Sequence, residues 1–137
     1  MGDIKISYVI VAREIDYISV NHNDMNGSKF AIIEPLIGLE VISIPQMINT
    51  RIAFTTVGMT LGEEYKTFFT LTDPNGKEII IKEKKFKCED NDSNPIVTTF
   101  VHNSAFNIEA YGEYVFKVGL KGHVSSEYTL YVSEGVI

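Results

Sequence analysis

The 137-residue chain has no tryptophan and a single cysteine, Cys88. One cysteine cannot close an internal disulfide, whereas small secreted domains usually depend on several. The N-terminal residues also lack the basic lead of a signal peptide, because Asp3 offsets Lys5. These absences predict a cytoplasmic protein.

The chain has little positive charge and no long apolar run. It carries 12 basic and 18 acidic residues, a net charge of −6. Phosphate recognition draws on clustered Lys and Arg, so we expect no nucleic-acid partner. The densest basic run, residues 82–87, is interrupted by Glu83 and is interpreted as an exposed strand face. The apolar stretch at residues 6–12 is too short to span a bilayer, so we expect no membrane association.

Catalytic and cofactor motifs are also missing. The sequence has no nucleophile elbow and no glycine-rich phosphate loop. His22, His102 and His123 stand apart from one another, without the spacing that would place two imidazoles on one metal, and are expected at the surface. We therefore predict a protein that is not an enzyme, with no catalytic, cofactor-binding or metal-binding residues and no cofactor.

Two local features leave alternatives open. Glu89, Asp90 and Asp92 form an acidic loop that is either simply solvated or a cation site, although it lacks the glycine and the final glutamate of an EF-hand. The same three carboxylates are the candidates for a dispersed hydrolase site. The lysines that flank Cys88 favour a lowered thiol pKa and modest reactivity, and the alternative is an inert cysteine.

What the chain does contain favours β-structure. Seven Tyr and eight Phe accompany many Ile, Val and Thr residues, a mixture typical of strands. Apolar and polar residues alternate with period two between turn signals, which predicts an all-β sandwich or barrel. We expect seven to nine strands in one domain over residues 1–137, with residues 46–51 as the best short helical segment.

The expected strands follow from this alternation. The first, at residues 4–12, is apolar on both faces, with Ile6, Tyr8 and Ile10 on one side and Val9 and Val11 on the other. Residues 15–20 are expected to extend this strand past a kink. The later strands are expected at residues 30–36, 39–44, 51–57, 65–72, 78–87 and 96–101, with a closing hairpin near residues 114–132.

Turn residues separate these strands. Asp73-Pro74-Asn75-Gly76 is the strongest turn, because proline presets φ and the last two residues tolerate left-handed geometry. The Asn-Gly pair within residues 21–28 predicts another hairpin. Outward positions on the later strands hold Phe68, Val115 and Tyr131, which form a contact surface or lie beneath a loop.

The segment from Tyr111-Gly112 to Val118 resembles the approach to a late strand in immunoglobulin-like domains. That resemblance implies a tyrosine corner, in which the Tyr114 hydroxyl bonds to nearby backbone. With its turns, the whole chain resembles a family of short bacterial and phage-borne proteins classed only as a domain of unknown function. The resemblance implies an antiparallel, two-sheet, immunoglobulin-like sandwich and no activity.

A sandwich without catalytic motifs favours a non-catalytic binding or assembly module. Its partner would be another protein or a second copy, bound through a sheet face or an edge strand. The alternative is a phage or mobile-element protein that binds a small molecule or a host defence factor. A dispersed hydrolase site is the third hypothesis.

Overall fold

The computed structural model describes residues 4–18, 29–88 and 97–135, and these residues confirm the all-β prediction. They contain no helix that is long and apolar enough to cross a membrane. The described strands are β1 (Lys5–Ile18), β2 (Lys29–Pro35), β3 (Gly38–Val41), β4 (Gln46–Ile48), β5 (Arg51–Val57), β6 (Glu64–Thr72), β7 (Glu78–Lys87), β8 (Val97–Asn103), β9 (Phe106–Ile108), β10 (Gly112–Leu120) and β11 (Val124–Glu134).

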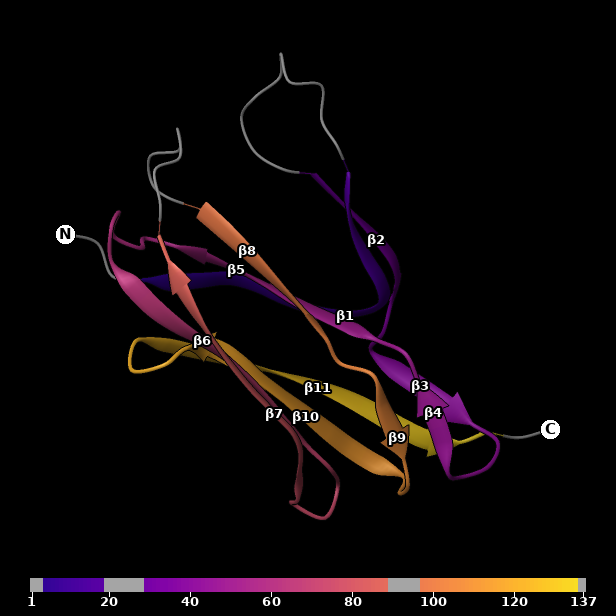
Figure 1. Cartoon of the computed structure of the whole chain (residues 1–137). Helices are drawn as coiled ribbons and strands as arrows, with labels where there is room; N and C mark the ends of the chain where they lie inside the picture. Colours follow the sequence, from indigo (N-terminus) through magenta and orange to yellow (C-terminus); the bar gives the residue numbers. More distant parts are fainter. Residues whose placement is uncertain (1–3, 19–28, 89–96, 136–137) are drawn as a thin grey trace.

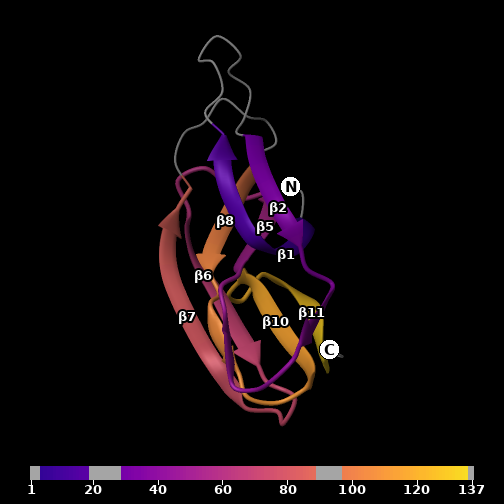
Figure 2. The ribbon, with the colours of Figure 1, turned by 90° about the vertical axis from the view of Figure 1, so that its right-hand side faces the viewer.

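The strands form two large sheets and one small one. The four-stranded sheet has the order β2-β1-β5-β8, and the five-stranded sheet has the order β3-β11-β10-β6-β7. The small sheet pairs β4 with β9. Figures 1 and 2 show the two large sheets as separate layers, with β4 and β9 at one end. Side chains from both layers meet in one shared hydrophobic core.

Three features differ from the sequence expectation. The described residues hold eleven strands rather than seven to nine. The segment expected to be helical, residues 46–51, begins with β4, because its backbone pairs with β9 and tertiary pairing outweighs local propensity. β3 runs parallel to β11, so the pairing is not entirely antiparallel.

β1 lies between β2 and β5, as its two apolar faces predicted. The predicted phase was wrong at its start, because the pairing with β5 skips one residue between Ile6 and Tyr8. This bulge turns Ile6 to the face that carries Val9 and Val11, where all three contact the core. Tyr8 is 40% exposed.

The hairpin between β6 and β7 agrees with the sequence prediction. Along β6 every second side chain is buried, as the alternation predicted. In the turn, the Asp73 Oδ1 accepts hydrogen bonds from the backbone N of Asn75 and of Lys77, both at 2.9 Å. Gly76 has a φ of 85°, in the left-handed region that favours glycine. The expected turn at residues 21–28 lies outside the described residues.

Aromatic rings run in contact through the core and link all three sheets. The centroids of neighbouring rings lie between 5.0 and 6.1 Å apart. Such separations are typical of favourable aromatic pairs. In order of contact, the rings are Phe86, Phe100, Phe54, His102, Phe69, Phe116, Phe106 and Tyr114.

Tyrosine hydroxyls tie irregular backbone to the sheets. The Tyr114 hydroxyl donates a 2.7 Å hydrogen bond to the backbone O of Ala110, which is the contact that a tyrosine corner requires. The Tyr114 ring is 1% exposed, so this bond is shielded from water. Similar bonds join the hydroxyls of three further tyrosines to backbone groups: Tyr65 to Thr60 N, Tyr111 to Val41 O and Tyr128 to Leu36 O.

We predict that Tyr114→Phe lowers the free energy of unfolding by about 1–2 kcal/mol, because it leaves the Ala110 carbonyl without its hydroxyl donor. Urea denaturation followed by circular dichroism measures the change. Tyr131→Phe is the control, since Tyr131 is 53% exposed and its loss of a hydroxyl should cost almost nothing. Equal stability of the two variants would contradict the role of the corner.

Candidate functional site

A groove of about 530 Å³ lies on the face of the five-stranded sheet that points away from the core. Side chains of β6 and β7 and the turn between β10 and β11 enclose it. Its apolar lining comes from Phe68, Ile81, Leu120 and Val124. The volume falls within the range of about 300–1,000 Å³ that is usual for ligand sites.

Strand alternation and register produce the floor of this groove. Because Thr67 and Phe69 point into the core, Phe68 between them points outward. On β10, Gly119 pairs in register with Phe68, and the Phe68 ring lines the hollow of the groove. Ile81, on the neighbouring strand, is 66% exposed and extends the floor.

The turn from β10 to β11 forms one wall of the groove. Gly122 adopts a φ of 80° there, and the backbone N of His123 donates a 3.0 Å hydrogen bond to the Leu120 carbonyl. The exposed His123 ring meets the edge of Tyr65, with centroids 5.2 Å apart. A Cβ atom at Gly119 would lie 2.1 Å from the Val124 carbonyl oxygen, so this approach of the two strands requires glycine.

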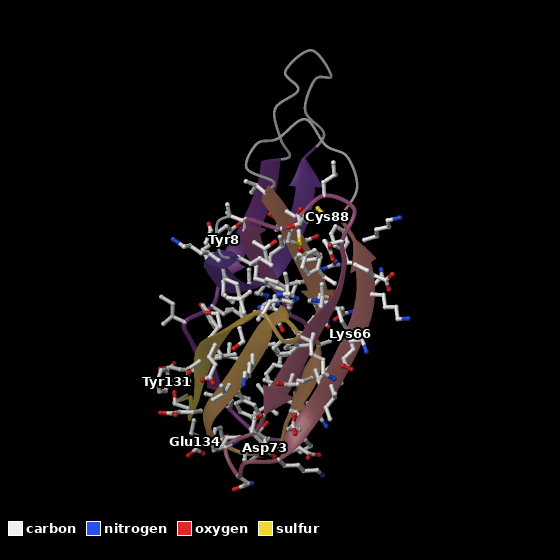
Figure 3. All side chains as sticks on the ribbon, turned by 90° about the vertical axis from the view of Figure 1, so that its left-hand side faces the viewer. Tyr8, Lys66, Asp73, Cys88, Tyr131 and Glu134 are labelled. Atoms are coloured by element: carbon white, nitrogen blue, oxygen red, sulfur yellow. The ribbon has the colours of Figure 1, made fainter. Side chains whose placement is uncertain are left out.

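Lysines surround one end of the groove. Lys121 Nζ lies 3.2 Å from Glu83 Oε2, an exposed ion pair. Directly beside it, Lys66 on β6 pairs in register with Lys85 on β7, so two like charges stand opposite one another on the same face. Like charges in this arrangement destabilise a sheet. Figure 3 views the molecule from the left-hand side of Figure 1 and labels Lys66.

Lys117 lies at the other end of the groove. Lys117 pairs in register with Thr70 on β6 and with Glu127 on β11. Together the two ends hold Lys66, Lys85, Lys117 and Lys121 against Glu83 and Glu127. This part of the surface therefore has an excess of positive charge, although the whole chain has a net charge of −6.

The predicted outward residues do point away from the core, but they do not form one patch. Phe68 lines the groove, whereas Val115 is half-buried further along β10. Tyr131 is 53% exposed on β11, well away from Lys66 in Figure 3. Of these three predicted contact residues, the structure places Phe68 in the groove.

The histidines have different surroundings. His22 lies outside the described residues, and His123 is exposed, as predicted for a surface histidine. The surface prediction was wrong for His102, which is half-buried and whose ring packs between Phe54, at 6.1 Å, and Phe69, at 5.9 Å. Its Nε2 is buried and has no hydrogen-bond partner in the described part of the chain.

The core position of His102 favours its neutral form. Burial lowers the pKa of the imidazole, and the positive charges of Lys82 and Lys84 lower it further. The Lys82 ammonium group donates a 2.7 Å hydrogen bond to the backbone O of Asn103, one residue beyond His102. The structure therefore gives His102 a packing role, in which protonation would place a charge among aromatic rings.

The described residues show neither a reactive thiol at Cys88 nor a cation site at the acidic loop that the sequence suggested. Cys88 is 1% exposed and packs against Met59, and burial raises the pKa of its thiol. The interpretation of a lowered thiol pKa was therefore wrong, because desolvation outweighs the nearby lysines. Glu89, Asp90 and Asp92 lie outside the described residues. Residues 4–18, 29–88 and 97–135 contain no cluster of three or more His, Cys, Asp or Glu side chains that could hold a metal ion.

Sequence reasoning missed a second exposed apolar region, at the opposite end of the fold. Ile37, Ile42 and Met47 are 75%, 62% and 58% exposed in and around β3 and β4. The sequence predicts a strand at residues 39–44 and a short helical segment at residues 46–51, either of which would bury part of its apolar side chains. Another hollow of about 530 Å³ lies beside them, but more polar groups line it.

Comparison with known proteins adds no family. No protein-family model matches the chain, and no curated protein matches it significantly. The groove on the five-stranded sheet is the stronger candidate site, because an apolar floor and a charged rim occur there together.

We predict that Gly119→Ala lowers the free energy of unfolding by about 1–3 kcal/mol, because the new methyl group would collide with the backbone of β11. The measurement is chemical denaturation. Gly38→Ala is the matched control, since a Cβ there would be 3.7 Å from its nearest neighbour, an ordinary contact. If Gly119→Ala were as stable as Gly38→Ala, the close packing of the two strands would be refuted.

The lowered pKa of His102 predicts a loss of stability in mild acid. Below its ordinary pKa of 6.5 the histidine takes up a proton in the unfolded chain more readily than in the core, so the free energy of unfolding falls as pH falls. His102→Phe should remove this part of the pH dependence between pH 7 and pH 5. Urea denaturation at several pH values measures the slope.

His123→Asn serves as the control for that experiment, because His123 is exposed and its replacement should leave the slope unchanged. A His102→Phe variant that retains the full slope of the parent protein would contradict the assignment.

Proposed function

We propose that the chain is one immunoglobulin-like β-sandwich domain. The order β1-β5-β8 corresponds to strands A, B and E of that fold, and β11-β10-β6-β7 corresponds to G, F, C and C′. The hairpin connection between β10 and β11 matches the F–G connection. This correspondence supports the resemblance to small immunoglobulin-like proteins that the turn and strand pattern suggested.

Details of β10 support the same assignment. Tyr114 lies near the start of this strand and makes the corner bond to Ala110. In antibody domains the second core cysteine follows the corner tyrosine by two residues. Phe116 occupies that position here and stacks on Phe69, with centroids 6.0 Å apart. Aromatic packing would thus replace the disulfide in a reducing compartment.

We further propose that the domain is a non-catalytic module that binds another protein through the groove on its five-stranded sheet. The observation that carries this proposal is the exposed Ile81 beside Phe68, enclosed by lysines on both ends. Apolar surface with a polar rim is typical of protein contact sites. The volume of the groove also suits a small organic ligand, which is the second candidate.

Photo-crosslinking in the source cells tests this function. We predict that p-benzoylphenylalanine at position 81 forms covalent adducts of discrete mass with a partner protein. The same group at Lys77, in the exposed turn between β6 and β7, is the control and should not form them. Adducts that are the same at both positions, or absent at both, would contradict a protein-binding groove.

A further inference from the structure

The outer face of β6 and β7 has three consecutive rows of side chains along the groove. Register places Lys66 opposite Lys85, Phe68 opposite Glu83, and Thr70 opposite Ile81. The β10–β11 turn adds Lys121 to the first end, where its backbone N donates a 2.8 Å hydrogen bond to the Lys66 carbonyl. Lys117 pairs with Thr70 at the other end.

The groove therefore has an excess of positive charge at the Lys66 end, Lys117 beside Glu127 at the other end, and an apolar middle. Lys66 and Thr70 are four positions apart, so the two ends are separated by about 14 Å at 3.4 Å per residue. Between them lies the hollow that the Phe68 ring lines. Glu83 is engaged with Lys121, which leaves the Lys66 and Lys85 ammonium groups without a carboxylate partner in the described part of the chain.

Charge argues against a second copy of the chain as the occupant. A symmetric dimer places the same patch of both molecules together, so lysines would face lysines. A purely apolar ligand would leave the rim lysines without a role. An anionic partner satisfies both ends, and an extended chain supplies groups at the required spacing, because every second side chain points to the same face.

We propose that the groove binds an extended peptide segment with the pattern acidic-x-apolar-x-acidic, an inference that rests on the proposed protein-binding function. The first and fifth side chains of such a segment are about 14 Å apart and point the same way. One carboxylate would meet Lys66 and Lys85, and the other would meet Lys117. The central apolar side chain would enter the hollow beside Phe68.

A peptide titration tests this pattern. The probe is acetyl-Gly-Asp-Thr-Ile-Thr-Asp-Gly-amide, added to the ¹⁵N-labelled protein while amide resonances are followed by NMR. We expect the amides of Phe68, Ile81 and Val124 to shift in a saturable manner. A peptide with both Asp replaced by Asn should bind about tenfold more weakly, since two exposed ion pairs are lost. Moving the second Asp next to Ile should weaken binding to a similar degree.

Variants of the protein localise the contact. Lys66→Gln and Lys117→Gln should each weaken the peptide about threefold, as expected for one exposed ion pair. Lys77→Gln is the control, because Lys77 is exposed in the distant β6–β7 turn and should leave affinity unchanged. All three replacements are at solvent-facing positions, and amide spectra without peptide verify that each variant is folded.

Several outcomes would overturn the inference. It fails if the groove amides do not shift, if the Asn peptide binds as well as the Asp peptide, or if sodium octanoate shifts these amides and the peptide does not. If position 81 crosslinks a protein in cells while no acidic peptide binds, the acidic pattern is wrong and the binding function stands. If neither experiment detects a partner, both proposals fail.

Discussion

Contact between aromatic rings across the core is the interaction on which the rest of the structure depends. The rings from Phe86 to Tyr114 form an unbroken series that includes residues of all three sheets. Each large aromatic side chain can bury about 150–250 Å². A chain with one cysteine and no tryptophan thus packs its layers without a disulfide. His102 is the one ionisable imidazole in this series, which links core packing to proton uptake.

The geometry of the groove is a consequence of this core. Phe69 and Leu71 are 0% exposed, and their burial sets the phase of β6. Because neighbouring side chains alternate between faces, Phe68 and Thr70 are then forced outward. Gly119 pairs with Phe68 and allows β10 and β11 to approach closely, while the Phe68 ring lines the groove. A shift of one residue in the register of β6 would point Phe68 and Thr70 into the core and Phe69 and Leu71 outward. Both the core and the groove would then be lost.

Sequence reasoning succeeded where local chemistry decides the structure. The alternation in β6, the Asp73 turn and the inward position of Tyr114 all follow from neighbouring residues. It failed where pairing with a segment distant in the sequence determines the local structure. The bulge between Ile6 and Tyr8 depends on pairing with β5, and the parallel pairing of β3 depends on a strand near the other end of the chain. Hydrophobic periodicity contains no information about either partner.

The candidate site was less predictable than the fold for the same reason. The outward direction of Phe68 follows from alternation, but the significance of Gly119 and the pairing of Lys66 with Lys85 require the register between strands. In the sequence, the lysines of residues 82–87 indicate an exposed face and nothing more. In the sheet, Lys85 stands opposite Lys66 at a local cost in stability. An anionic group placed between these two lysines would remove that repulsion, which is the physical basis of the acidic pattern that we propose for the ligand.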